Sequence, residues 1–299
     1  MLTAKALHGV VVAIVTPFAR DEALDLPGLE RLTEHLIRSG VHAVMTCGGN
    51  GEFVHLTREE KWQITERVVK VARGRLPVIA GAAACSTREA IELTLDARAA
   101  GADAAILVPP YYFKLPDEAL YRHFATVARA TKLPLVVYNN PAYTGHNLAP
   151  PLIARLARVP GIIGLKQSQA DMGQLVEAIR VAGDRIAILT GIDSQFYPSL
   201  CVGAQGIFST AACVIPRQMA AIYAAFRRGD HRAALRVHRE IQALNRYLEY
   251  DPGYVNACKA ALDLMGLPGG PVRAPMPPLT AGERAAIRRA LGDLKLLRR

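Results

Sequence analysis

The sequence contains few cysteines, and their spacing excludes the common cysteine-based sites. The five cysteines are odd in number and far apart, with no Cys-x-x-Cys pair and no zinc-ligand spacing; they are Cys47, Cys85, Cys201, Cys213 and Cys258. No Asn-x-Ser/Thr glycosylation site occurs either. These absences disfavour disulfide-rich secreted scaffolds and zinc modules. We interpret the cysteines as reduced thiols and expect a cytoplasmic protein.

Long apolar runs and nucleic-acid signatures are also absent. No apolar run approaches the length of a membrane span, and the first run, VVVAIV near residue 11, is followed by no small-residue cleavage site. We therefore interpret that run as a strand and expect no membrane partner. The net charge is +10, but no zinc-finger spacing, aromatic RNA-binding signature or basic arm accompanies it. We expect no nucleic-acid partner, and interpret the charge as favouring anionic substrates.

The phosphate-binding glycine motifs are missing, which bears on the fold. Neither GxGxxG after the first strand nor GxxxxGK[ST] occurs, so an open nucleotide-binding sheet is disfavoured. Eight apolar runs alternate instead with amphipathic helical stretches: VVVAIV, VHAVMT, LPVIAG, DAAILV, LPLVVY, GIIGLK, RIAILTG and QGIFS. Continuous Val/Ile/Leu runs between helices indicate parallel strands covered on both faces. The pattern predicts an α/β fold, a (β/α)8 TIM barrel.

Beyond Pro216 the pattern becomes purely helical, in three segments near 217–227, 230–249 and 253–297 with breaks. We therefore expect two parts, with residues 1–226 forming the barrel catalytic domain and residues 227–299 forming a C-terminal helical extension. No linker composition separates them.

Lys166 is the residue that most needs an explanation. It ends the apolar run GIIGLK, and a lysine is seldom buried because removing an ammonium from water is costly. In a barrel it would lie at the carboxyl end of the sixth strand, where active sites are built. A lysine attacks a ketone only as the neutral amine, which dry surroundings favour. We therefore predict imine chemistry at Lys166, with Tyr138 at the end of the fifth run as the proton-transfer group.

Three motifs carry a resemblance to a known family. Gly48–Glu52 (GGNGE), Tyr138–Gly145 (YNNPAYTG) and Gly161–Lys166 (GIIGLK) occur in order. They resemble the G-[ST]-x-G-E, Y-N-x-P-x-x-T-G and G-[IV]-x-G-[IL]-K motifs of the dihydrodipicolinate synthase/N-acetylneuraminate lyase superfamily of Schiff-base aldolases. The resemblance covers nearly the whole chain.

The resemblance implies a role for each matched residue. Lys166 forms an imine with pyruvate or a longer 2-oxo acid, and Tyr138 transfers protons. Gly49 and Asn50 bind the carboxylate, where close approach of backbone N–H groups also suits an anion. Tyr112 matches a tyrosine that is presented to a neighbouring subunit, and a homotetramer is expected. No cofactor and no metal are expected, and His42, His55, His123 and His146 show no metal-ligand spacing.

The departures from the family pattern bear on the substrate. Gly49 lies where dihydrodipicolinate synthases carry a threonine hydroxyl. Tyr143 lies where they carry an arginine that binds the distal carboxylate of the second substrate, and a phenol cannot replace a bidentate charged pair. Cys85 replaces an asparagine of the feedback site, which makes feedback inhibition by lysine doubtful.

The remaining candidates follow the other strands. Gly191, Asp193 and Phe208 are predicted to line the substrate site with Tyr143. Asp193 either contacts substrate hydroxyls or caps a helix, and Glu52 is expected to cap or to pair structurally.

The prediction is a metal-independent class I aldolase that acts on 4-hydroxy-2-oxo or 2-keto-3-deoxy acids. The alternatives are 4-hydroxy-tetrahydrodipicolinate synthase, a dehydratase or deaminase of the same superfamily, or a barrel that binds sugar acids without catalysis. The sequence leaves these alternatives open.

Overall fold

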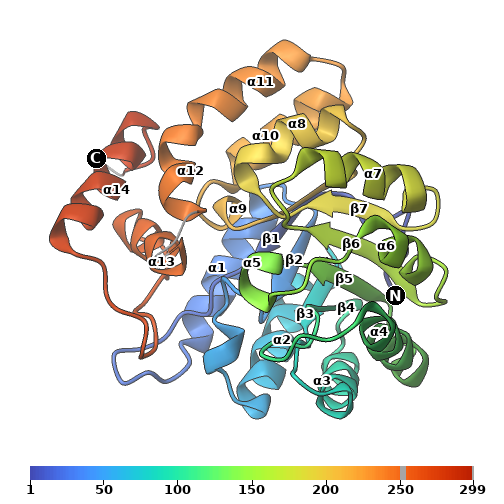
Figure 1. Ribbon diagram of the computed structural model, residues 1–299. Coiled ribbons are helices and arrows are strands. Elements are labelled where there is room, and N and C mark those ends of the chain that lie inside the picture. The colour runs from blue at the N-terminus through green and yellow to red at the C-terminus, as the bar shows by residue number, and fades with distance from the viewer. Residues whose placement is uncertain (250–253, 298–299) are drawn as a thin grey trace.

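Eight parallel strands form a closed barrel, as the alternating pattern predicts (Figure 1). The computed structural model describes residues 1–249 and 254–297. The strands follow one another around the barrel in chain order, and β1 pairs with β8 to close it. Their bounds are β1 Gly9–Ala13, β2 Ala43–Thr46, β3 Val78–Gly81, β4 Ala104–Leu107, β5 Leu135–Asn139, β6 Ile162–Gln167, β7 Ala187–Thr190 and β8 Gly206–Ser209.

Helices cover the outside of the barrel between these strands. Capping side chains begin several of these helices: Thr57 and Glu60 form a capping box at α2, and Ser86 caps α3. The helices of the barrel are α1 Leu26–Arg38, α2 Arg58–Ala72, α3 Thr87–Ala99, α4 Asp117–Thr131, α5 Pro141–Thr144, α6 Pro150–Leu156, α7 Met172–Ala182, α8 Phe196–Cys201, α9 Ala211–Val214 and α10 Pro216–Arg227. Two 3₁₀ turns are η1 Phe53–His55 and η2 Asp193–Gln195.

The C-terminal extension is divided more finely than the sequence predicts. Segment 230–249 contains two helices, α11 His231–Glu240 and α12 Gln242–Leu248. Segment 253–297 contains α13 Tyr254–Leu264 and α14 Ala281–Asp293, with a Gly- and Pro-rich stretch between them that supports no helix. Residues 250–253 and 298–299 lie outside the described residues, and the boundary at residue 226 stays a prediction. No helix of residues 1–249 and 254–297 has the length and apolarity needed to span a membrane.

The barrel interior is a packed apolar core below the site. Side chains from alternating strands fill it, among them Val11, Met45, Ile79, Val136 and Leu189. In a separate, larger cluster, α9 and α10 pack against the outside of β1, and the extension helices α11 and α13 pack in turn against α10 and α9. In Figure 1 the extension lies beside the barrel, with α12 and α13 close to its open end.

A buried ion pair joins the extension to the loop after β2. Lys259 on α13 and Glu52 are 1% and 2% exposed, and Nζ lies 2.5 Å from Oε1. Lys259 also donates to the carbonyl of Pro271 (2.7 Å), and Glu52 accepts from the backbone N–H of Arg273 (3.0 Å). Burial lowers the pKa of Lys259, while the charge of Glu52 opposes the shift. The expectation that Glu52 pairs structurally is therefore confirmed.

Lys259→Met should lower the free energy of unfolding by about 3–5 kcal/mol, because it leaves the buried Glu52 carboxylate without its ammonium partner. The double variant Glu52→Gln/Lys259→Met should be less destabilised than Lys259→Met alone. Urea unfolding followed by circular dichroism measures both. Arg122→Met, which breaks the exposed pair with Glu118, is the control and should cost less than about 1 kcal/mol. Equal costs for Lys259→Met and Arg122→Met would contradict the assignment.

Candidate active site

A cavity of about 440 Å³ opens at the carboxyl ends of the strands. It brings together seven residues that the sequence predicts for the site: Gly49, Asn50, Tyr138, Tyr143, Lys166, Gly191 and Asp193. These residues come from the loop after β2, from β5, α5 and β6, and from the segment that follows β7. The cavity therefore lies where the sequence predicts the site, at the carboxyl ends of the strands.

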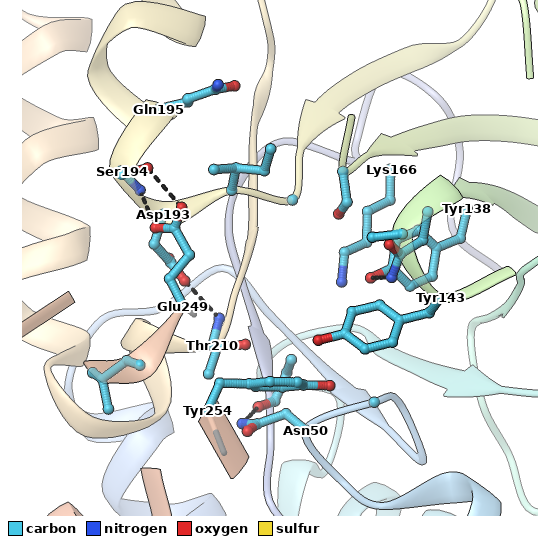
Figure 2. A pocket seen from close by; sticks show the side chains of 18 of the residues that line it. Asn50, Tyr138, Tyr143, Lys166, Asp193, Ser194, Gln195, Thr210, Glu249 and Tyr254 are labelled. Atoms are coloured by element: carbon cyan, nitrogen blue, oxygen red, sulfur yellow. Dashed lines mark hydrogen bonds between the residues drawn. The ribbon is translucent and has the colours of Figure 1, made fainter. Parts of the chain in front are cut away.

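Lys166 lies at the centre of one wall with its amine directed into the cavity (Figure 2). The residue is only 6% exposed. Its Nζ is 4.1 Å from the centroid of the Tyr138 ring and 5.7 Å from that of the Phe208 ring. Within the described residues, no carboxylate forms an ion pair with it. A buried lysine without a carboxylate partner matches the surroundings in which a neutral amine becomes a nucleophile.

Gly191 gives Lys166 the room to lie there. A Cβ on Gly191 would be 2.7 Å from Lys166 Cε and 2.0 Å from Ser168 Oγ. Both contacts are shorter than carbon and oxygen atoms allow, so any side chain at this position would displace the lysine or the serine. Gly191 thus shapes the wall behind the amine as well as lining the cavity.

Tyr138 is held in place by its neighbour in the Asn-Asn-Pro turn. The Nδ2 group of Asn140 donates a hydrogen bond to the Tyr138 hydroxyl at 2.9 Å. Tyr143 lies on the short helix α5 and is 55% exposed, which places it at the entrance. Its ring faces that of Tyr254 at a centroid distance of 6.3 Å. The phenol next to the lysine is therefore oriented, whereas the second phenol borders solvent.

The loop Gly48–Glu52 presents its backbone to the cavity. The Asn50 side chain is turned into the protein, where its Nδ2 donates to the carbonyl of Ala13 (2.6 Å) and lies 3.6 Å from Cys258 Sγ. In the described part of the chain, the N–H groups of Gly49 and Asn50 donate no hydrogen bond. Two backbone donors on one loop suit the carboxylate of a 2-oxo acid.

Asp193 supports the loop after β8. Its carboxylate accepts hydrogen bonds from the Ser209 hydroxyl and from the N–H groups of Thr210 and Ala211, both at 3.1 Å. The helix-cap alternative is wrong as stated, because Asp193 lies inside η2 and binds the start of α9 instead. Burial raises the pKa of Asp193 from 3.8 to about 6, and the nearby charge of Glu249 adds to the shift; the bond from Ser209 and the charge of Lys166 oppose it.

Among the cavity residues that the sequence prediction missed are Ser194, Glu249 and Tyr254. Glu249 accepts from the Ser194 backbone N–H (2.7 Å) and hydroxyl (2.6 Å), and burial raises its pKa. Figure 2 shows this pair across the cavity from Lys166. Glu249 and Tyr254 come from the extension, far along the chain from the recognised motifs, and no local pattern marks them.

Two predicted residues lie elsewhere. Phe208 is 1% exposed in the barrel interior and lies beneath Lys166 rather than in the cavity lining. The prediction that Phe208 binds substrate is therefore replaced by a packing role next to the lysine. Tyr112 is 90% exposed, outside the cavity of its own chain, and its ring contacts Phe113. Its contribution to a neighbouring subunit, and the homotetramer, stay predictions.

The cavity lining contains few charged side chains. Lys166 is the only lysine or arginine among the lining residues that the structure describes, and Asp193 and Glu249 are the acids. No group of three or more His, Cys, Asp or Glu side chains that could hold a metal ion occurs within residues 1–249 and 254–297. A substrate anion in this cavity therefore has Lys166 as its only cationic partner among the described lining residues, and its other partners are neutral hydrogen-bond donors.

Asp193→Asn tests the buried carboxylate. A folded-state pKa of about 6 exceeds the ordinary 3.8, so the folded protein holds the extra proton between these values. Its stabilising contribution is complete below about pH 4 and is lost as the pH rises through about 6. The free energy of unfolding of the wild type, relative to Asp193→Asn, should fall by about 2–3 kcal/mol from pH 4 to pH 7. Urea titrations at several pH values measure this difference, and a constant difference would contradict the shift.

Comparison with known proteins gives one consistent result. A family model described as the dihydrodipicolinate synthetase family matches residues 6–294. The chain is 40% identical over 287 residues to a 4-hydroxy-tetrahydrodipicolinate synthase of Methanoculleus marisnigri, an alignment that covers 95% of this chain and 98% of that one.

Solved structures agree with the sequence comparison. A dihydrodipicolinate synthase from Acinetobacter baumannii, complexed with pyruvate, is 36% identical with a TM-score of 0.94, covering 97% of this chain and 100% of that one. A prophage protein of the dihydrodipicolinic acid synthase family from E. coli K12, also in complex with pyruvate, is 32% identical with a TM-score of 0.93 and covers 97% and 99%.

Proposed function

We propose that this chain, which belongs to the dihydrodipicolinate synthetase family and is a lyase, forms an imine between Lys166 and pyruvate or a related 2-oxo acid. The observation that carries the proposal is the Lys166 amine itself, 6% exposed, 4.1 Å from the Tyr138 ring centroid and without a carboxylate partner in the described residues. The two relatives crystallised with pyruvate support this substrate class.

The chemistry follows from the order of groups around the cavity. Neutral Lys166 Nζ attacks the 2-oxo carbon, and water leaves to give a protonated imine that draws electrons from the adjacent carbon. Loss of a proton or of an aldehyde from that side gives an enamine, which can attack an aldehyde in the reverse direction. Tyr138, oriented by Asn140, carries the proton to and from these atoms. The backbone N–H groups of Gly49 and Asn50 hold the carboxylate.

The activity for which the relatives are named favours one candidate for the second substrate. Relatives about 40% identical to this chain are 4-hydroxy-tetrahydrodipicolinate synthases, so condensation of the pyruvate enamine with aspartate semialdehyde is the first reaction we propose. The alignment over nearly the whole chain supports it. The ammonium group of this semialdehyde would face Glu249 and Asp193, whose carboxylates lie in the lining.

The distal half of the cavity favours a second candidate. Tyr143 provides a phenol at the entrance, and the described lining has no cation except Lys166 to receive a distal carboxylate. Ser194, Glu249 and Asp193 instead offer hydroxyl and carboxylate oxygens. That set suits the hydroxyl groups of 2-keto-3-deoxy acids, which supports aldol cleavage of such acids to pyruvate and an aldehyde.

Borohydride trapping tests the imine. Incubation with pyruvate and sodium borohydride should add one reduced pyruvate unit to Lys166, as measured by intact mass and peptide mapping. Lys166→Arg should abolish the adduct and lower turnover by about three orders of magnitude or more, because a guanidinium cannot act as the neutral nucleophile. Lys61→Arg, outside the cavity lining, is the control and should still be labelled. A wild-type protein without an adduct would favour a sugar-acid-binding barrel without catalysis.

Tyr143→Arg tests the choice of second substrate. Initial rates with pyruvate plus aspartate semialdehyde, and with 2-keto-3-deoxygluconate, are measured for the wild type and the variant. The guanidinium should raise kcat/KM for the semialdehyde, which bears a distal carboxylate, by about tenfold or more. It should not raise kcat/KM for 2-keto-3-deoxygluconate, whose distal end is neutral. Tyr143→Gln, which adds no charge, is the matched control. Wild-type activity with the semialdehyde that Tyr143→Arg does not improve would show that Tyr143 is not next to the distal carboxylate.

A further inference from the structure

We infer that Tyr254, the first residue of α13, is a substrate-binding residue whose hydroxyl donates to the carboxylate of the 2-oxo acid beside the Gly49–Asn50 backbone. This inference rests on the proposed function and adds one residue to it, from a part of the chain that carries none of the recognised motifs. Tyr254 lines the same cavity as Lys166, Tyr138 and Asn50. Figure 2 shows it below Tyr143 and next to Asn50.

The hydroxyl of Tyr254 occupies the space that a side chain on Gly49 would need. A Cβ built on Gly49 lies 2.6 Å from Tyr254 Oη and 3.8 Å from Cζ. Only the hydroxyl is too close, since 3.8 Å is an ordinary contact for two carbon atoms. Gly49 does not have a backbone conformation reserved for glycine, because its φ lies outside the left-handed region. The glycine therefore makes room for the tyrosine hydroxyl and is not required by the turn.

Helix α13 holds Tyr254 against this loop through its next turn. Cys258 Sγ lies 3.6 Å from Asn50 Nδ2, and Lys259 forms the buried ion pair with Glu52. Residues 254 and 258 are four apart and share one face of the helix, and Lys259 follows on the adjacent side, so the helix touches the loop at three points. The loop and the phenol are thus fixed relative to each other before substrate binds.

A substrate carboxylate beside Gly49 and Asn50 needs hydrogen-bond donors. Gly49 and Asn50 have N–H groups without acceptors in the described residues, and the Asn50 amide is turned away to Ala13. The Tyr254 hydroxyl, 2.6 Å from the position of a Cβ on Gly49, adds a neutral donor beside that backbone for the same anion. It does so at low entropic cost, since a tyrosine has only two rotatable side-chain bonds. The carboxylate is the group of a 2-oxo acid that accepts such bonds most strongly.

Tyr254→Phe is the first test. The variant should raise KM for pyruvate, and the pyruvate concentration needed for half-maximal borohydride trapping on Lys166, by roughly ten- to a hundredfold, because a hydrogen bond to a charged group is lost. Trapping at saturating pyruvate should remain complete, so the imine is tested separately from the tyrosine. Tyr247→Phe, on α12 and outside the lining, is the matched control and should leave both values unchanged. Unchanged half-maximal trapping in Tyr254→Phe would overturn the inference and leave the imine proposal intact.

A double-mutant cycle with Gly49 separates binding from a merely structural role. Gly49→Ala should weaken trapping in the wild-type background, because its Cβ displaces the Tyr254 hydroxyl, but should cost little in Tyr254→Phe, where that hydroxyl is gone. Gly49→Ser in Tyr254→Phe places a hydroxyl near the same point and should recover at least part of the lost affinity for pyruvate. Additive losses in the cycle, or no recovery with serine while the proteins remain folded by circular dichroism, would overturn the inference.

Discussion

The site depends on one register contact in the closed barrel, the pairing of Tyr138 on β5 with Lys166 on β6. Residues paired in register on adjacent strands project to the same side of the sheet, so the phenol ring and the amine emerge together at the carboxyl end. The ring closes over one side of the amine at 4.1 Å, and the bare backbone of Gly191 leaves room on the other. The barrel thereby buries Lys166, and no carboxylate among the described residues forms an ion pair with it.

The C-terminal extension completes the site and does more than cover the barrel. Glu249 follows α12 and fixes Ser194 on the opposite wall, while α13 brings Tyr254 over Gly49 and Lys259 under the same loop. An ion pair buried at this depth is a weak source of net stability compared with apolar packing. Its value here is positional, because it fixes which face of α13 meets the loop Gly48–Glu52.

The sequence predicts those parts of the fold and the site that a local pattern of residues determines. The eight apolar runs mark the strands, and Lys166 and Tyr138 are found because each ends a strand in a parallel barrel, where the carboxyl ends converge. Phe208 also lies on a strand and faces the barrel interior, but the strand pattern does not give its depth, and the structure places it in the core beneath Lys166. Glu249 and Tyr254 reach the cavity because the helices of the extension pack against the barrel. Their distance along the chain from the barrel motifs does not predict that contact.

The electrostatics of the cavity limit which second substrates it can hold. Burial raises the pKa of Asp193 to about 6 and also raises that of Glu249, and the charge of Glu249 makes Asp193 harder to ionise. The protonated imine that we propose at Lys166 carries a positive charge opposite these acids, and that charge favours ionisation of both. In this proposal, a second substrate with hydroxyl or ammonium groups gains interactions with the two acids, whereas a second carboxylate meets like charge. The proposed selection between second substrates thus rests on the same buried carboxylates that line the cavity.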